Sequence, residues 1–142
     1  MGFLDRFKKN KNIEYSNKLD AKRLGRSFKA AFEGIASTYK KEQNIKIHTF
    51  ISILVVVFGF FLKINYIEWL VCLVLIGFVL MAEFFNTAIE YVVDLASPDI
   101  HPLAKAAKDT ASAGVLMMAI IAAVIGLVIF VPKLIVFVGG YF

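Results

Sequence analysis

The stretch Glu83-Phe-Phe-Asn86-Thr-Ala-Ile-Glu90-Tyr-Val-Val-Asp94 closes a long, mostly apolar segment of the chain. Inserting one acidic side chain at the centre of a hydrocarbon span costs about 2.5–3.5 kcal/mol, so such groups face protein or a polar site. With about 100° of rotation per residue, four polar side chains share one helix face, with Asn86 beside them: Glu83, Thr87, Glu90 and Asp94. The stretch therefore predicts a polar site at a membrane surface.

The composition places the whole chain in the membrane. It has 142 residues, of which 59% are hydrophobic, and a mean hydropathy of +0.73. A soluble domain is nearer about 45–50% apolar. The length suits a single domain. The one cysteine, Cys72, lies in a predicted span and is interpreted as a small buried apolar residue, so no disulfide forms within one chain.

The charges are unevenly distributed. Residues 1–48 hold 12 of the 16 Lys and Arg and 5 of the 11 Asp and Glu, a net charge of +7, and the remainder carries −2. A basic segment of this kind is typical of a cytoplasmic N-terminus near the anionic lipid of the cell (plasma) membrane. The spans beside it favour lipid over nucleic acid as the partner, so we expect no nucleic-acid binding.

Hydrophobic periodicity predicts an all-α integral membrane protein with an N-terminal amphipathic surface helix and three transmembrane helices. Residues 1–18 form a polar leader and residues 19–142 the membrane domain. The surface helix is expected at about 20–36. The spans are expected at about 45–62, 67–89 and 113–131 or beyond, with Pro132 interrupting the third.

An odd number of spans fixes the topology once the N-terminus is placed inside. The loop over residues 94–112 is then cytoplasmic, and the C-terminus is outside. Glu42, the acidic stretch and the segment 105–112 are therefore expected on the same, cytoplasmic, side of the membrane.

The acidic residues predict chemistry as well as position. Mg²⁺ is usually held by one or two carboxylates together with substrate phosphates. Glu83 is the deepest of the acidic side chains and the best general-base candidate, whereas Glu90 is nearer the surface and suits a metal ligand. Glu42 is a second metal candidate, although it also forms an i, i+4 pair with Lys46. The alternative is that the carboxylates only join helices together.

A second cluster precedes the third span. Its members share one helix face at i, i+3, i+4 and i+7: Lys105, Lys108, Asp109 and Ser112. Lysine is a compact donor to phosphate, and a helix N-terminus favours an anion. Ordinary snorkelling of the lysines at the membrane boundary is the alternative. His48 is interpreted as a polar tip at the interface, and His101 as a solvated loop residue.

Known soluble nucleotide folds are not indicated. The sequence contains no Walker A motif, kinase glycine loop, zinc signature, GxSxG elbow or dinucleotide fingerprint. Any use of ATP must therefore rely on a different architecture.

Two ordered motifs resemble those of the small prokaryotic diacylglycerol kinases. They are Glu83-x-x-Asn86-Thr-Ala-Ile-Glu90-x-x-x-Asp94 and the later Ala-Lys108-Asp109-x-x-x-Ala-Gly-Val-Leu. The resemblance covers roughly residues 20–131. Upstream, Glu42-x-Asn44-x-x-Ile47-His48 resembles the Gram-positive branch, whose members act mainly as undecaprenol kinases.

The resemblance implies a homotrimer of three-span protomers whose sites are shared between neighbouring subunits. It implies transfer of the γ-phosphate of Mg-ATP to a lipid hydroxyl, with Glu83 as the general base and with Glu42 and Glu90 on the metal. The residues that it places near the nucleotide or its phosphates, or near the lipid head, are Arg23, Arg26, Asp99, His101, Lys108 and Asp109. The residues that it places in support of the substrates are Asn86, Asp94 and Ser112.

The acceptor lipid stays open at this point. A tyrosine of the diacylglycerol branch is Ala30 here, and a carboxylate of that branch is His48. Undecaprenol is the expected substrate, and diacylglycerol, converted to phosphatidic acid, is the alternative. The hypothesis from another class is a non-enzymatic membrane assembly that uses its acidic residues to join helices.

Overall fold

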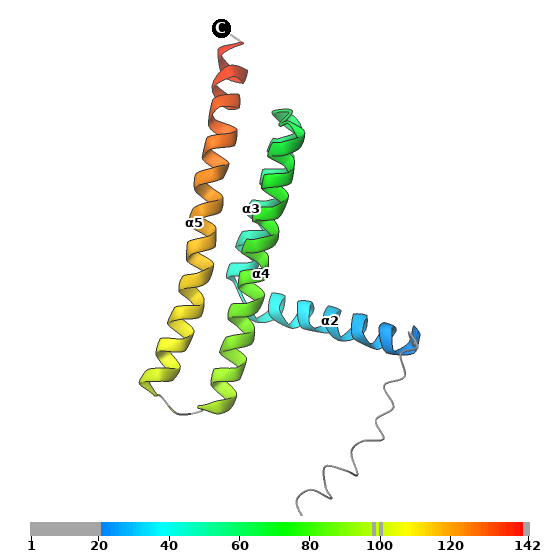
Figure 1. Cartoon of the computed structure of the whole chain (residues 1–142), viewed down its shortest axis with the longest axis vertical. Coiled ribbons are helices and arrows are strands. Elements are labelled where there is room, and N and C mark those ends of the chain that lie inside the picture. Colours follow the sequence, from blue (N-terminus) through cyan, green and yellow to red (C-terminus); the bar gives the residue numbers. More distant parts are fainter. Residues whose placement is uncertain (1–20, 98, 100, 141–142) are drawn as a thin grey trace, which may run out of the picture. The chain divides into compact units, whose positions relative to one another are not determined.

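The computed structural model describes residues 21–97, 99 and 101–140. The regular elements in these ranges are four α-helices: α2 (Ala21–Lys41), α3 (Asn44–Phe61), α4 (Tyr66–Ala96) and α5 (Pro102–Gly139) (Figure 1). They fall into two compact units that divide between Ile35 and Ala36. The prediction of an all-α fold is confirmed, and the predicted leader, residues 1–18, lies outside the described residues.

Helix α2 has the expected amphipathic pattern. Leu24, Phe28 and Phe32 recur at helical spacing, and each exposes more than half of its surface. An apolar stripe of this kind lies in a membrane interface more readily than in water. The helix ends at Lys41 and not near residue 36, because its last turn needs no apolar residue. Lys40 and Lys41 in that turn complement the negative end of the helix dipole.

The three predicted spans are confirmed as helices long and apolar enough to cross a membrane: α3, α4 and α5. The bounds of α3 match the predicted 45–62. Helix α4 continues past residue 89 to Ala96, and α5 begins at Pro102, well before residue 113. The predicted bounds followed hydropathy, which marks only the apolar part of a helix, whereas backbone hydrogen bonding continues through the polar turns.

The predicted interruption at Pro132 is wrong. Helix α5 runs through Pro132 to Gly139. Proline removes one backbone donor but leaves the helix intact where neighbouring contacts support it. The next residue, Lys133, places its Nζ 2.9 Å from Glu68 Oε2, so this part of α5 is linked to α4.

Helix α4 is the central element of the second unit. It packs along α5 and against α3 (Figure 1). The apolar side chains buried in the described chain are few: Ile45, Ile64, Cys72, Val79 and Val115. Most large apolar side chains on the spans are exposed, as expected where hydrocarbon is the surrounding solvent. Cys72 is buried among them, as predicted.

The turn between α3 and α4 is tightly built. Lys63 has a positive φ of 50°, and the Ile64 amide donates to the Gly59 carbonyl at 3.1 Å, which closes the end of α3. Asn65 then caps α4. Its Oδ1 accepts from the Glu68 amide at 3.0 Å, while Glu68 Oε2 accepts from the Asn65 amide at 2.6 Å. This reciprocal pair fixes where α4 begins.

Gly59 permits the close approach of α4 to this turn. A Cβ at Gly59 would lie 2.8 Å from Trp69 Cη2 and 3.1 Å from Ile64 Cδ1. We expect Gly59→Ala to lower the free energy of unfolding by about 1–3 kcal/mol, because both neighbours must move. Thermal unfolding in detergent micelles measures the loss. Gly77→Ala is the matched control, since a Cβ there meets nothing within 4 Å. Equal stability of the two variants would contradict the expectation.

Candidate functional site

The predicted polar face of α4 is present, and its burial is graded along the helix. Glu83, Asn86 and Thr87 are buried, with 1%, 4% and 1% of their surfaces exposed. Glu90 is half-buried and Asp94 is exposed. The Thr87 hydroxyl donates to the Glu83 backbone carbonyl at 3.0 Å, so it needs no partner on another helix. The helix thus carries one carboxylate deep within the packed helices and two closer to its C-terminal end.

Glu83 has a partner that the sequence analysis did not assign to it. His48 on α3 places Nε2 3.3 Å from Glu83 Oε1. That oxygen has no hydrogen-bond partner within the described protein, so the two groups lie close together without hydrogen-bond alignment. His48 was interpreted as a polar tip at the interface. The signal that could have located it is the i, i+4 spacing from Asn44, on the face of α3 that also carries Ser52 and turns toward α4.

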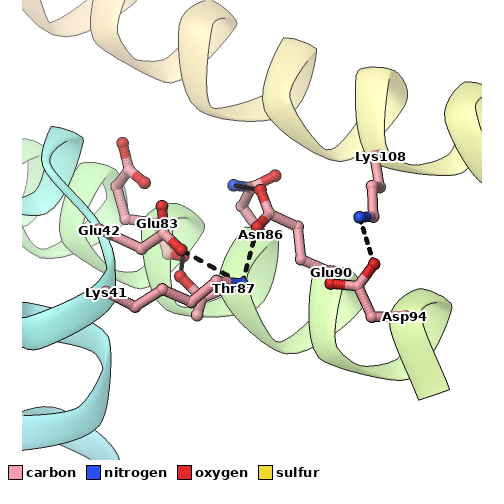
Figure 2. A network of polar contacts seen from close by, with 8 residues as sticks. All are labelled: Lys41, Glu42, Glu83, Asn86, Thr87, Glu90, Asp94 and Lys108. Carbon is pink, nitrogen blue, oxygen red and sulfur yellow. Dashed lines mark hydrogen bonds and ion pairs between the residues drawn. The ribbon is translucent and has the colours of Figure 1, made fainter. Parts of the chain in front are cut away.

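Glu42 and Glu90 converge on a single ammonium group. Lys41 Nζ lies 3.0 Å from Glu90 Oε2 and 3.5 Å from Glu42 Oε1 (Figure 2). It also lies 4.3 Å from the centroid of the Tyr91 ring. The sequence offered Lys46 as the alternative partner of Glu42, and the structure gives Lys41 that contact. Asn86 Nδ2 donates to Glu90 Oε1 at 3.2 Å, which joins this group to the buried part of α4.

The ammonium of Lys41 is held in its charged form. Partial burial acts to lower its pKa, but the hydrogen bond to Glu90 and the charges of Glu90 and Glu42 outweigh burial. The pKa of Lys41 is therefore raised above its ordinary value. Two carboxylates and one cation thus form a compact charged group at the end of α2 and along α4.

The lysines before the third span pair with nearby carboxylates. Lys108 Nζ donates to Asp94 Oδ1, which ties the start of α5 to the end of α4 (Figure 2). Lys105 pairs with Asp109 one turn along α5. The predicted shared face is present, and these contacts add a link between Lys108 and α4 that spacing alone did not indicate.

Two cavities meet beside Glu83. The first, of about 500 Å³, is called the polar cavity below and has in its lining polar side chains from α3, α4 and α5: Asn44, His48, Glu83, Asn86, Asp109 and Ser112. The second, of about 580 Å³, is apolar and lies between α3, α4 and α5. It is lined by residues that include Val55, Cys72, Leu75, Val79, Ala122 and Gly126. His48 and Ala119 line both cavities, so they mark the junction.

The site also contains oxygens suited to a cation or a hydroxyl. Glu42 Oε1, Glu83 Oε1 and Asn86 Oδ1 are buried and have no hydrogen-bond partner in the described protein. Buried acceptors of this kind are normally satisfied. No group of three or more His, Cys, Asp and Glu suited to a metal occurs among the described residues. Two converging carboxylates nevertheless fit Mg²⁺, which takes its other ligands from water and substrate phosphates.

Besides Lys108, four predicted nucleotide residues line neither cavity. The imidazole Nδ1 of His101 accepts from the Leu103 amide at 3.2 Å and so caps the start of α5. Asp99 is exposed, and its carbonyl accepts from the Ser97 hydroxyl at 3.0 Å. Arg23 and Arg26 are exposed on α2, in the unit that ends at Ile35. A role for these four in nucleotide binding stays a prediction.

Known proteins are similar to this chain over most of its length. The family described as prokaryotic diacylglycerol kinase matches residues 29–130. The chain is 42% identical over 121 residues to an undecaprenol kinase from Bacillus subtilis, covering 85% of this chain and 97% of that protein. It is 36% identical to a diacylglycerol kinase from Synechocystis over 76% of this chain and 62% of that protein. A diacylglycerol kinase from Helicobacter pylori is 31% identical over 68% of this chain and 78% of that protein.

The buried hydroxyl of Thr87 makes a testable contribution to the packing of α4. We expect Thr87→Val to lower the free energy of unfolding by about 1 kcal/mol, because the Glu83 carbonyl loses a buried donor. Thr110→Val is the control: its hydroxyl makes the same type of bond to Ala106 at 2.8 Å in an exposed position. Thermal unfolding of both variants in micelles compares them, and a larger loss for Thr110→Val would refute the expectation.

Proposed function

This chain belongs to the prokaryotic diacylglycerol kinase family and is a multi-pass membrane lipid kinase with ATP as co-substrate, and we propose that undecaprenol is its acceptor. The product would be undecaprenyl phosphate. The observation that carries the proposal is the position of Glu83, a buried carboxylate beside the junction of a polar and an apolar cavity. The 42% sequence identity to the undecaprenol kinase from Bacillus subtilis, over most of both chains, supports the choice of acceptor.

The apolar cavity suits the chain of the lipid. Its lining combines small side chains on α5, such as Ala122 and Gly126, with larger ones on α3 and α4, such as Val55 and Leu75. A hydrocarbon chain along this surface gains from burial, and the Ser52 hydroxyl in the lining already donates to the His48 carbonyl. Its terminal hydroxyl would then reach the junction at His48 and Ala119, next to Glu83.

Glu83 would act as the general base. The reaction is an in-line displacement in which the lipid oxygen attacks the γ-phosphorus and ADP leaves. Glu83 would accept the hydroxyl proton as the new oxygen–phosphorus bond forms. Its unpartnered Oε1 is available to accept from a hydroxyl. Because little covalent chemistry is left to the protein, positioning and charge neutralisation would supply most of the rate enhancement.

The charged group around α4 would hold Mg-ATP. Glu42 and Glu90 would bind Mg²⁺, which supplies neutralisation of the phosphate charge when it is bound. Lys108 and Asp109 would organise the nucleotide phosphates, with Asn86, Asp94 and Ser112 in support. Arg23, Arg26, Asp99 and His101 would contribute from the nucleotide or lipid-head side. Asn86 supports this arrangement because it bonds Glu90 and also lines the polar cavity.

We also propose that the enzyme is a homotrimer in the plasma membrane, with its N-terminus and active site in the cytoplasm. The excess of positive charge before residue 49 supports the orientation. Extensive exposed apolar surface on the spans and a small buried core within one chain support assembly with other copies. The hypothesis of a non-enzymatic assembly is set aside, since the family is one of kinases.

Diacylglycerol is the second candidate acceptor. Three further relatives that share 31–36% identity with this chain over 68–76% of its length are diacylglycerol kinases. The chemistry at Glu83 would be the same, because both lipids present a primary alcohol. The two lipids differ in the hydrocarbon that the apolar cavity must accept. Undecaprenol has one linear isoprenoid chain, and diacylglycerol has two acyl chains.

A labelled-ATP assay on the purified full-length protein in mixed micelles tests both parts of the proposal. With undecaprenol and diacylglycerol offered separately, we expect label to move mainly to undecaprenol. Glu83→Gln should lower turnover by about 10²–10⁴-fold, the usual contribution of a general base. Glu33→Gln is the control, because Glu33 is an exposed carboxylate on α2 that pairs only with Lys29 one turn away among the contacts described here.

Each outcome of this assay decides something. Preference for diacylglycerol would keep the kinase and overturn the proposed acceptor. Near-normal turnover in Glu83→Gln would overturn the assignment of the base. If folded, unsubstituted protein, shown by cooperative thermal unfolding, transfers label to neither lipid, both proposed acceptors would be overturned.

A further inference from the structure

Every turnover leaves a proton on a buried group. In the proposed reaction the O–H bond of the lipid breaks as the O–P bond forms. The terminal P–O bond of ATP breaks with its electron pair leaving on ADP, and the proton passes to Glu83. The Glu83 side chain is only 2% exposed. A buried carboxylic acid must lose this proton before it can act as a base again, so the site requires an acceptor for it.

We propose that His48 is that acceptor and returns Glu83 to its carboxylate form between turnovers. Its Nε2 lies 3.3 Å from Glu83 Oε1, within reach of direct transfer after a small adjustment. The His48 side chain is 21% exposed, about ten times the fraction of Glu83, and it lines the polar cavity. The proton would move from Glu83 Oε1 to Nε2 and then from the imidazolium to water on the open side.

The surroundings of His48 favour a transient positive charge. Glu83 faces it from α4, and Asp109 lines the same polar cavity from α5. On its own helix, Asn44 lies one turn away in the same lining and is uncharged. Imidazole exchanges protons near neutral pH, so a stable ion pair is not required.

The competing explanation is that His48 only orients the Glu83 side chain. The two differ in what a glutamine at this position does. Its amide can donate to a carboxylate as imidazole does, but it cannot accept and release a proton at neutral pH. A purely orienting role therefore tolerates His48→Gln, and a proton-accepting role does not.

The inference rests on Glu83 being the base, and one series of full-length variants tests it in micelles. We expect His48→Gln to lower kcat about 10–100-fold with a smaller change in KM. The pH dependence of kcat should differ between the parent and His48→Gln, because the variant has lost one of the two proposed proton-carrying groups. Imidazole in the buffer should partly restore His48→Ala in a concentration-dependent way. Lys46→Gln, an exposed change on the same helix, should leave kcat unaltered.

The controls separate this inference from the proposed function. Full activity and a parent-like pH profile in His48→Gln, with Glu83→Gln inactive, would refute the proton-accepting role and leave the kinase mechanism standing. Absence of imidazole rescue in a His48→Ala protein that melts like the parent would refute it as well. Full activity in both His48→Gln and Glu83→Gln would instead remove the assigned base.

A different observation carries a second inference, about metal entry. Lys41 Nζ lies between Glu42 and Glu90, the two carboxylates proposed to bind Mg²⁺ (Figure 2). An ammonium and a divalent cation repel one another at this range and compete for the same oxygens. We infer that Lys41 is the counter-ion of the pair when no nucleotide is bound, and that a metal ion and Lys41 exclude each other there.

This arrangement favours entry of the metal together with ATP. The free carboxylate pair is already neutralised in part by Lys41, so a metal ion alone gains little by binding. A metal ion that arrives on the nucleotide brings phosphate oxygens, and these provide an anionic partner for the displaced ammonium. Tyr91 already lies 4.3 Å from that ammonium, and its ring can hold a lysine that has left the carboxylates.

Binding of Mn²⁺ to the nucleotide-free protein, followed by electron paramagnetic resonance, tests this inference without turnover. Lys41→Met should bind Mn²⁺ about tenfold more tightly than the parent. Lys40→Met, an exposed neighbouring lysine, should match the parent. Adding Glu42→Gln or Glu90→Gln to Lys41→Met should abolish the gain. Equal Mn²⁺ affinity of Lys41→Met and the parent, together with weaker Mn²⁺ binding in the glutamine variants, would refute the competition between Lys41 and the metal but keep the metal site. No change in any variant would remove the metal assignment that this inference rests on.

Discussion

The constraint on which this structure depends is the cost of keeping a carboxylate within packed apolar helices. Glu83 lies where α3, α4 and α5 meet, with almost no exposed surface. A group of that kind persists only with a nearby partner and a polar opening. His48 is the partner, and the polar cavity is the opening. The apolar cavity on the other side of the same junction then makes this a place where a lipid hydroxyl and a phosphate could meet.

The sequence predicted the helices and the polar face of α4 because both follow from periodicity within one segment. Glu83, Asn86 and Thr87 recur at helical spacing, and their burial follows from the side of α4 they share. Helix ends were less predictable. Hydropathy does not detect the backbone hydrogen bonds that extend α4 to Ala96 and begin α5 at Pro102. The proline at position 132 was expected to interrupt the third span, but α5 continues through it.

Contacts between helices were the part that sequence could not provide. The pairing of His48 with Glu83 depends on the register of α3 against α4, and neither helix encodes that register in its own periodicity. The position of Lys41 between Glu42 and Glu90 depends in the same way on how the end of α2 meets α4. His101 is exposed between the helices, as expected of a solvated loop residue, and its side chain also caps α5, a role that the following Pro102 could have indicated.

The ion pairs at the two ends of α4 have a consequence for the depth of the reaction. Glu68 binds Lys133 near one end, and Asp94 binds Lys108 near the other, so α4 and α5 are linked twice along roughly 40 Å, at about 1.5 Å of rise per residue. Two such links prevent one helix from sliding past the other by a turn. Glu83 then lies at a fixed distance along α4 from both links, because the helix backbone sets that spacing. In the proposed reaction, this fixed level would favour an alcohol by how far below the head groups its oxygen resides, before any feature of its hydrocarbon is recognised.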